Sequence, residues 1–260
     1  MPDTEHRPTT RILDILELLA DVSSGLSLTE ISEAINAPKS SISPLIHTLA
    51  SRKYIFYNKQ TQKYSIGIAA FSVGSAYIKQ MTPIQFIQSE MRHLTDTCGE
   101  TCQLGIRDKD MVLYIAKVEP VVPIRLISYV GSRLPCYCTA IGRSLIYDLS
   151  LKELKQLYPR GLQPFTSSTT TDFNTLFRFL QEIKSTGISK ECEETTPNLV
   201  CIATPLCKGT DVVAALSVSV PIFRMTPEKE AMIIELLKSK RKTIEIYFND
   251  YDIDPNLLAL

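Results

Sequence analysis

The sequence predicts an α+β fold in two parts: short helices and a two-stranded hairpin at the N-terminus, then an antiparallel sheet with helices segregated around it. One observation is periodicity, because apolar residues recur at helical spacings up to residue 52 and in strand-like runs beyond residue 100. The other is charge. No Asp or Glu occurs between Glu33 and Glu90, whereas that stretch contains Lys39, Arg52, Lys53, Lys59, Lys63 and Lys79. Since the whole chain has 28 basic and 28 acidic residues, this local positive region predicts a surface that meets nucleic acid.

A first, supporting helix is predicted over Arg11 to Asp21. Four apolar side chains share one stripe of it: Ile12, Ile15, Leu16 and Leu19. Thr9 or Thr10 is expected to cap its N-terminus, because a threonine hydroxyl can accept a hydrogen bond from an unpaired N–H of the first turn.

Two further helices form a helix-turn-helix pattern. Ser27 to Glu30 has the S-x-x-E form of a capping box, which predicts a helix from Leu28 to Asn36. Pro38 breaks that helix and opens the next, which is predicted to end at Arg52. Its apolar positions are Ile42, Leu45, Ile46 and Leu49. Its other face has short polar side chains that suit a major groove about 12 Å wide. The candidate DNA contacts are Lys39, Ser40, Ser41, Ser43 and His47.

A hairpin with a basic tip follows. Tyr54 to Tyr57 and Lys63 to Ile66 are predicted strands that flank the polar segment 58–62. Such a wing would reach the flanking DNA backbone, with Lys59 and Lys63 as its candidate phosphate contacts. A generic small core with solvated lysines would show much of the same pattern. The combination of capping box, three helices, hairpin and missing acids favours DNA binding.

The remaining elements follow from apolar runs and turn residues. A connecting helix is predicted over Ile68 to Thr82, and Pro83 marks a domain boundary. Predicted strands are Thr101 to Arg107, Met111 to Glu119, Ile124 to Val130, Leu199 to Leu206 and Val212 to Val220. Predicted helices are Pro83 to Gly99, Thr139 to Asp148, Leu151 to Tyr158, Phe173 to Ser185 and Pro227 to about Tyr247.

Bulk composition argues against several classes of function. No apolar run approaches about 18 residues and the polar start lacks a signal-peptide core, so a cytoplasmic protein without membrane contact is expected. The seven cysteines form no C-x-x-C pair, so we expect free thiols, no metal and no cofactor. Catalysis is not expected either, because only His93 could serve Cys98 or Cys102 as a base.

Several segments carry a family resemblance in their order and spacing. They are Arg11-Ile-Leu-Asp-Ile-Leu, Leu28-Thr-Glu-Ile, Pro38-Lys-Ser-Ser, Tyr64-Ser-Ile-Gly67, Leu104-Gly-Ile-Arg-Asp, Gly131-Ser-Arg-Leu-Pro135, Thr139-Ala-Ile-Gly-Arg143, Val200-Cys-Ile-Ala-Thr-Pro205 and Ala214-Ala-Leu-Ser-Val-Ser219. Together they resemble the IclR family of bacterial transcription regulators along nearly the whole chain. Departures from the family pattern are Pro44, where an Arg is usual, and Lys53, where a Gly is usual.

The resemblance implies a winged helix-turn-helix DNA-binding domain over residues 1–67, a linker helix over 68–82 and a GAF-like α/β effector-binding domain with an antiparallel sheet over 83–260. It implies a homodimer or homotetramer that binds double-stranded DNA at a palindromic operator. A small organic effector would control that binding.

Carried over onto matching positions, the family's effector pocket would involve Leu126, Ala140, Ile141, Glu191, Cys201, Ser217 and Ser219. A small carboxylic acid or metabolite would suit it, because the loop Leu134 to Thr139 enters a helix whose first N–H groups could face an anion. Glu191 would repel a carboxylate unless a ligand hydroxyl or amine faced it. Each residue also has a structural alternative: Cys201 in the core, Glu191 in a solvated loop, and the serines on the sheet surface.

A thiol-based redox-sensing regulator is the alternative function. Cys136 and Cys138 stand where a helix is predicted to begin. A helix N-terminus can lower the pKa of a thiol and thereby make it reactive.

Overall fold

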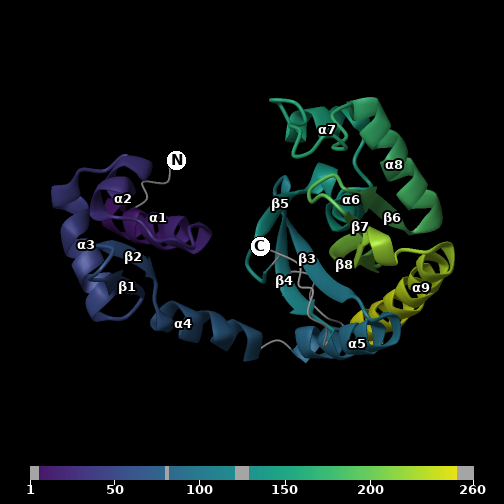
Figure 1. Ribbon diagram of the computed structural model, residues 1–260, viewed down its shortest axis with the longest axis horizontal. Coiled ribbons are helices and arrows are strands. Elements are labelled where there is room, and N and C mark those ends of the chain that lie inside the picture. Colours follow the sequence, from purple (N-terminus) through teal and green to yellow (C-terminus); the bar gives the residue numbers. More distant parts are fainter. Residues whose placement is uncertain (1–5, 80–81, 121–128, 251–260) are drawn as a thin grey trace. The chain divides into compact units, whose positions relative to one another are not determined.

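A computed structural model describes residues 6–79, 82–120 and 129–250 (Figure 1). The chain divides into two compact units, Met1–Met81 and Thr82–Leu260. Each unit has its own sheet and its own hydrophobic core. The predicted fold class is confirmed: a winged helix-turn-helix comes first, and an α+β unit with an antiparallel sheet follows.

The N-terminal unit is built on three helices: α1 (Arg7–Asp21), α2 (Leu28–Ala34) and α3 (Lys39–Ser51). Each helix contributes a fully buried isoleucine to one core, and these are Ile15, Ile31 and Ile42. The capping box is confirmed, because Ser27 Oγ accepts a hydrogen bond from Glu30 N and Glu30 Oε2 accepts one from Ser27 N. Local sequence signals therefore set the start of α2.

The start of α1 differs from the prediction. The helix begins at Arg7, so Thr9 and Thr10 lie inside its first turn and neither residue caps it. His6 occupies the cap position, and its Nδ1 lies 2.9 Å from Thr9 Oγ1. Pro8 accounts for the earlier start, because its fixed φ suits the first turn, where its missing N–H costs no helical hydrogen bond.

Strands β1 (Ile55–Asn58) and β2 (Lys63–Ile66) form the predicted antiparallel hairpin. Leu26, in the connection between α1 and α2, forms an isolated bridge to Tyr64. The two residues exchange backbone hydrogen bonds of 2.9 and 2.7 Å. These hydrogen bonds attach strand β2 of the wing to the connection between α1 and α2.

The ends of the hairpin are tightly constrained. Lys53, just before β1, has a φ of 63°, a conformation that glycine adopts more easily than lysine. Gly67 follows β2, and a Cβ at this position would lie 2.3 Å from Lys53 O. The chain then enters α4 (Ile68–Lys79), the predicted connecting helix.

A six-stranded antiparallel sheet forms the centre of the C-terminal unit, in the order β5-β4-β3-β8-β7-β6. Its strands are β3 (Thr101–Asp108), β4 (Met111–Val118), β5 (Arg133–Pro135), β6 (Ser189–Cys192), β7 (Leu199–Lys208) and β8 (Asp211–Pro221). One face is covered by α5 (Thr82–Cys98) and α9 (Pro227–Asp250) (Figure 1). Against the other face lies α6 (Ala140–Leu145), accompanied by α7 (Leu151–Leu157) and α8 (Phe173–Thr186). Two short 3-10 helices are η1 (Cys136–Cys138) and η2 (Ile222–Arg224).

Three features of this unit differ from the sequence expectation. The edge strands β5 and β6 were not predicted, because three or four residues give too short a pattern to recognise. The predicted strand from Ile124 falls mostly outside the described residues, and its described end, Tyr129 and Val130, is not a strand. The helix expected from Thr139 to Asp148 ends at Leu145. Among the helices of the described ranges, none has the length and apolar character to cross a bilayer.

Candidate functional site

The outward face of α3 carries most of the candidate DNA contacts. Its exposed members are Lys39, Ser40, Ser43 and His47. Ser41 is only half-buried, but its hydroxyl donates to Pro38 O at 2.7 Å and so helps to close the helix start. The first turn of α3 contains no acidic residue. The structure therefore brings four exposed polar side chains together on one helix, which has a lysine and no acidic residue in its first turn.

Pro44 lies inside α3 without interrupting the helix. Proline has no N–H to donate to the carbonyl of Ser40, four residues earlier, and its ring crowds that carbonyl. One turn later, Thr48 Oγ1 donates to Pro44 O at 2.8 Å. The Pro44 ring is exposed, so the candidate DNA surface carries a rigid apolar group between its polar side chains.

The two wing lysines differ in their surroundings. Lys59 is exposed at the tip, where Asn58 Oδ1 accepts hydrogen bonds from Gln60 N and Thr61 N and orders the turn. Lys63 Nζ lies 3.9 Å from Glu30 Oε1, and its side chain is 35% exposed. The Glu30 carboxylate therefore offsets part of the positive charge of Lys63. Lys59 has no ion-pair partner among the described residues.

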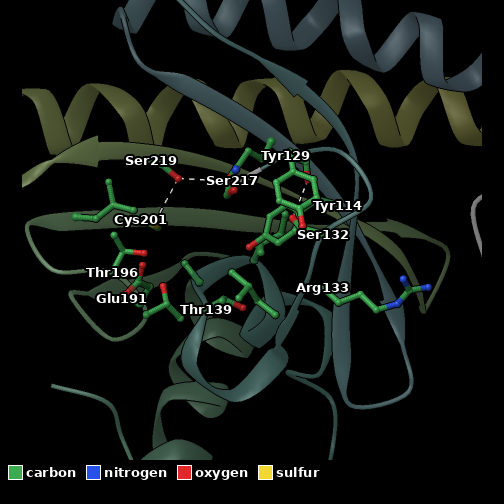
Figure 2. A pocket seen from close by; sticks show the side chains of 16 residues that line it. Tyr114, Tyr129, Ser132, Arg133, Thr139, Glu191, Thr196, Cys201, Ser217 and Ser219 are labelled. Carbon is green, nitrogen blue, oxygen red and sulfur yellow. Dashed lines mark hydrogen bonds between the residues drawn. The ribbon is translucent and has the colours of Figure 1, made fainter. Parts of the chain in front are cut away.

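A cavity of about 300 Å³ lies between α6 and the sheet of the C-terminal unit (Figure 2). It is lined by six of the predicted effector residues: Ala140, Ile141, Glu191, Cys201, Ser217 and Ser219. Leu126, the remaining one, lies outside the described residues. The strand register explains the grouping. Glu191 is opposite Cys201, and Cys201 is opposite Ser219, so these side chains share one face of the sheet.

Polar groups form a chain across the sheet side of the cavity (Figure 2). Cys201 Sγ and Ser219 Oγ lie 3.3 Å apart, and Ser219 Oγ donates to Gln103 Oε1 at 3.3 Å. Ser217 is opposite Gln103 in the register, and its hydroxyl has no hydrogen-bond partner within the described part of the chain. Burial raises the pKa of Tyr114 well above its usual value, so its hydroxyl stays protonated. These groups can donate to or accept from a polar ligand.

Helix α6 forms the opposite wall of the cavity. Thr139 caps it, with Oγ1 accepting from Gly142 N at 3.0 Å. Ala140 and Ile141 are the first two residues of the helix, and a helix leaves the N–H groups of its first turn without helical partners. Gly142 lets the helix approach the preceding turn, because a Cβ there would lie 2.3 Å from Cys136 Cα.

Behind this wall, Arg143 is 1% exposed. Its Nε donates to Tyr137 O at 2.8 Å, one terminal nitrogen donates to Lys190 O at 3.2 Å, and the other donates to Glu194 Oε2 at 2.6 Å. The guanidinium also lies 4.7 Å from the centre of the Phe179 ring. A buried ion pair therefore joins α6 to the turn after β6.

Glu191 is the carboxyl group of the cavity. The residue is 4% exposed, and its Oε2 accepts from Glu194 N at 3.0 Å. Burial raises the pKa of Glu191 to about 7, although hydrogen bonds from Cys201 and Glu194 act in the opposite direction. The carboxyl is thus divided between its charged and neutral forms near neutral pH. The alternative that placed Glu191 in a solvated loop is wrong.

Among the further lining residues that the sequence pattern alone does not identify are Gln103, Tyr114, Thr195 and Thr196. Gln103 offered a usable signal, because it is a polar residue within the apolar run T-C-Q-L-G-I and is buried. The two threonines lie in an irregular loop, where no periodicity in the sequence indicates which way a side chain points.

The cysteines are all free, as expected, but the structure does not favour the alternative that made Cys136 and Cys138 reactive. Cys136 and Cys138 are fully buried. Burial raises the pKa of Cys138 to about 12 and also raises the pKa of Cys136. The desolvation of these thiols outweighs any effect of the helix start, so the basis of the redox-sensing alternative is lost. In the described part of the chain, no group of three or more His, Cys, Asp and Glu residues could hold a metal ion.

The fold defines a class: a DNA-binding protein of the winged helix-turn-helix type with a separate α+β unit that contains a cavity. Two family models match the chain. The IclR helix-turn-helix domain matches residues 8–58, and the C-terminal domain of the bacterial transcriptional regulator IclR matches residues 75–245. The chain therefore belongs to the IclR family of bacterial transcriptional regulators.

Individual relatives agree with this assignment. The HTH-type transcriptional regulator BhcR of Paracoccus denitrificans is 34% identical over 239 residues, which cover 91% of this chain and 85% of that protein. An IclR transcriptional regulator from Alicyclobacillus acidocaldarius has the same fold, with a TM-score of 0.85, 22% identity and coverage of 94% and 99% of the two chains. An IclR homologue from Microbacterium hydrocarbonoxydans, solved in complex with 4-hydroxybenzoate, gives a TM-score of 0.77 at 18% identity, with coverage of 92% and 98%.

Proposed function

We propose that this transcriptional regulator binds a palindromic operator through α3 and the wing, and that a small organic effector in the α6 cavity controls this binding. The observation that carries the proposal is the convergence of polar and apolar side chains around one cavity of about 300 Å³. A cavity of this size suits a metabolite-sized ligand. We assign DNA binding to residues 1–67, a linker to 68–82 and effector binding to 83–260.

A small organic acid is the effector class that the cavity supports best. Ala140 and Ile141 offer N–H groups at a helix start, and Ser217 offers a hydroxyl from the sheet. Most of the remaining surface of the cavity is apolar, which suits a short carbon skeleton. The 4-hydroxybenzoate bound by the Microbacterium homologue has this chemistry.

Control of DNA binding requires that the effector binds the DNA-bound and free states with different affinities. If the effector binds both states equally, operator occupancy does not change, however tightly the effector binds. The proposal therefore depends on measured coupling as well as on binding. We expect no catalytic turnover of the ligand.

A homodimer or homotetramer is part of the proposal. A palindromic operator requires two helix-turn-helix units related by two-fold symmetry. On α4, the side chains of Ile68, Phe71 and Val73 are 64%, 69% and 58% exposed. Exposed apolar side chains of this size on a helix suit burial against another copy of the chain.

Replacing Lys59 with Ala is expected to reduce the salt dependence of DNA binding by about one unit in the slope of log K against log[salt], because one phosphate contact is lost. Lys63→Ala should change the slope less, since Glu30 already offsets part of that charge. Fluorescence anisotropy at several salt concentrations, with an operator duplex obtained by in vitro selection, measures both slopes. A changed sequence preference in Lys59→Ala would contradict the assignment of this residue to the phosphates.

Replacing Ser217 with Ala is expected to weaken effector binding roughly fivefold, because one hydrogen bond contributes about 1 kcal/mol. A thermal-shift screen of small organic acids identifies ligands, and calorimetry then compares wild-type with variant. Ser185→Ala is the matched control, since Ser185 is exposed on α8 and does not line the cavity. If no acid binds, or if both variants bind as well as wild-type, the α6 cavity is not the effector site.

A further inference from the structure

Glu191 stands out in the cavity because no described residue serves as its counter-ion. Within the described part of the chain, no Lys or Arg side chain forms an ion pair with this carboxyl. Arg143 is the nearest buried cation, but its hydrogen bonds go to Glu194 and to two backbone carbonyls. Arg133, which also lines the cavity, pairs with Asp108 at 2.8 Å. Figure 2 shows the Arg133 side chain directed away from Glu191.

The other titratable groups around Glu191 are acids or thiols. They come from the turn after β6, from β6 and β7, from β4, and from η1, and they are Glu193, Glu194, Cys192, Cys201, Tyr114 and Cys138. Burial keeps Cys201, Tyr114 and Cys138 protonated near neutral pH. The positive charges among the described neighbours are those of Arg143 and Arg133, which are already engaged by Glu194 and Asp108. Nothing in this set offsets a second negative charge beside Glu191.

We propose that an anionic effector enters this cavity together with one proton, which binds to the Glu191 carboxyl. This inference rests on the proposed effector function of the cavity. Oε2 of Glu191 accepts a hydrogen bond from Glu194 N, and we assign the proton to Oε1. A protonated Oε1 can donate a hydrogen bond to the effector carboxylate, and bonds to an ionised acceptor are among the stronger ones. The same carboxyl thus changes from a repelling group to a donor.

The sign of the pH effect follows from this coupling. The pKa of Glu191 is about 7 in the free protein. An anion beside the carboxyl raises this pKa further, so the effector binds more weakly as the pH rises above 7. For a single coupled proton, the dissociation constant should increase about tenfold between pH 6 and pH 8. Simple carboxylic acids are fully ionised over this range, so the ligand contributes no titration of its own.

The test uses the full-length protein with acetate, pyruvate and 4-hydroxybenzoate as probes. Calorimetry at pH 6 and pH 8, in two buffers with different ionisation enthalpies, gives both the dissociation constant and the number of protons taken up. Wild-type protein should bind about tenfold more weakly at pH 8 and should take up close to one proton per bound anion at that pH. Glu191→Gln should bind with the same affinity at both pH values and without proton uptake.

The outcomes separate the two claims. Equal affinity at pH 6 and pH 8 with no proton uptake in the wild-type protein would overturn the coupling and leave the effector site intact. Binding of none of the probes, together with a negative thermal-shift screen, would sink the effector proposal and the coupling with it. The proton count is measured on wild-type protein, so the result does not depend on whether the variant folds.

Discussion

Replacing Arg143 with Met is expected to lower the free energy of unfolding of the C-terminal unit by about 3–5 kcal/mol. Methionine preserves much of the side-chain volume but removes every donor. The carboxylate of Glu194, 7% exposed, would then remain buried without its cation. Two backbone carbonyls, those of Tyr137 and Lys190, would lose their donors as well. Urea unfolding, with hydrogen exchange resolved to peptides of residues 82–250, measures this loss in the relevant unit.

Arg178→Met provides the matched control. Its guanidinium lies over the same Phe179 ring, at 5.6 Å from the ring centre, but the residue is exposed on α8. Its replacement should change the free energy of unfolding by at most about 0.5 kcal/mol. The double variant Arg143→Met/Glu194→Gln should be less destabilised than Arg143→Met alone, because no orphan charge remains. Equal effects of Arg143→Met and Arg178→Met would show that the buried ion pair contributes nothing.

Local signals allowed much of the N-terminal unit to be predicted. The Ser27 capping box, the break at Pro38 and the apolar positions of α3 all act within one or two helical turns, so a short window of sequence contains them. The start of α1 was missed for a similar local reason. Pro8 was a stronger start signal than the threonines that follow it.

The cavity could be predicted only in part. The positions carried over from the family resemblance meet there because the register aligns Glu191, Cys201 and Ser219 across three strands. Register is a long-range property, and β6 is too short to reveal its own place in the sheet. Burial is long-range as well. The alternative that made Cys136 a reactive thiol at a helix start relied on local position, and the fold instead encloses this residue.

Arg143 and Glu194 illustrate the same limit. They are 51 residues apart in sequence, and nothing local indicates that an arginine in a T-A-I-G-R segment will be fully buried. Once buried, the pair connects the wall of the cavity to the turn after β6, where Glu194 N donates to the Glu191 carboxyl. Thr170 N donates to the same Glu194 carboxylate at 2.9 Å, so the loop before α8 is tied to this turn too. A change in the charge of Glu191 therefore acts on a turn with several fixed neighbours.

Replacing Glu191 with Gln is expected to stabilise the C-terminal unit at pH 8 by roughly 3 kcal/mol, even without an effector. The pKa of Glu191 is raised by burial from 4.5 to about 7 in the folded protein. The folded state therefore binds more protons than the unfolded state between these pH values. Accordingly, the wild-type free energy of unfolding falls as the pH rises from 4.5 to 7 and is level above that range. Glutamine is neutral at every pH and can still accept the hydrogen bond from Glu194 N.

The measurement is a comparison of urea unfolding at pH 5 and pH 8 for wild-type and Glu191→Gln. The two proteins should have similar stability at pH 5 and diverge at pH 8, with the variant more stable. Glu182→Gln, an exposed carboxylate on α8, should differ from wild-type by at most about 0.5 kcal/mol at both pH values. If Glu191→Gln is less stable than wild-type at pH 8, the folded state stabilises the carboxylate of Glu191. Desolvation then does not dominate the pKa of Glu191, and binding of an anionic effector should not be coupled to proton uptake.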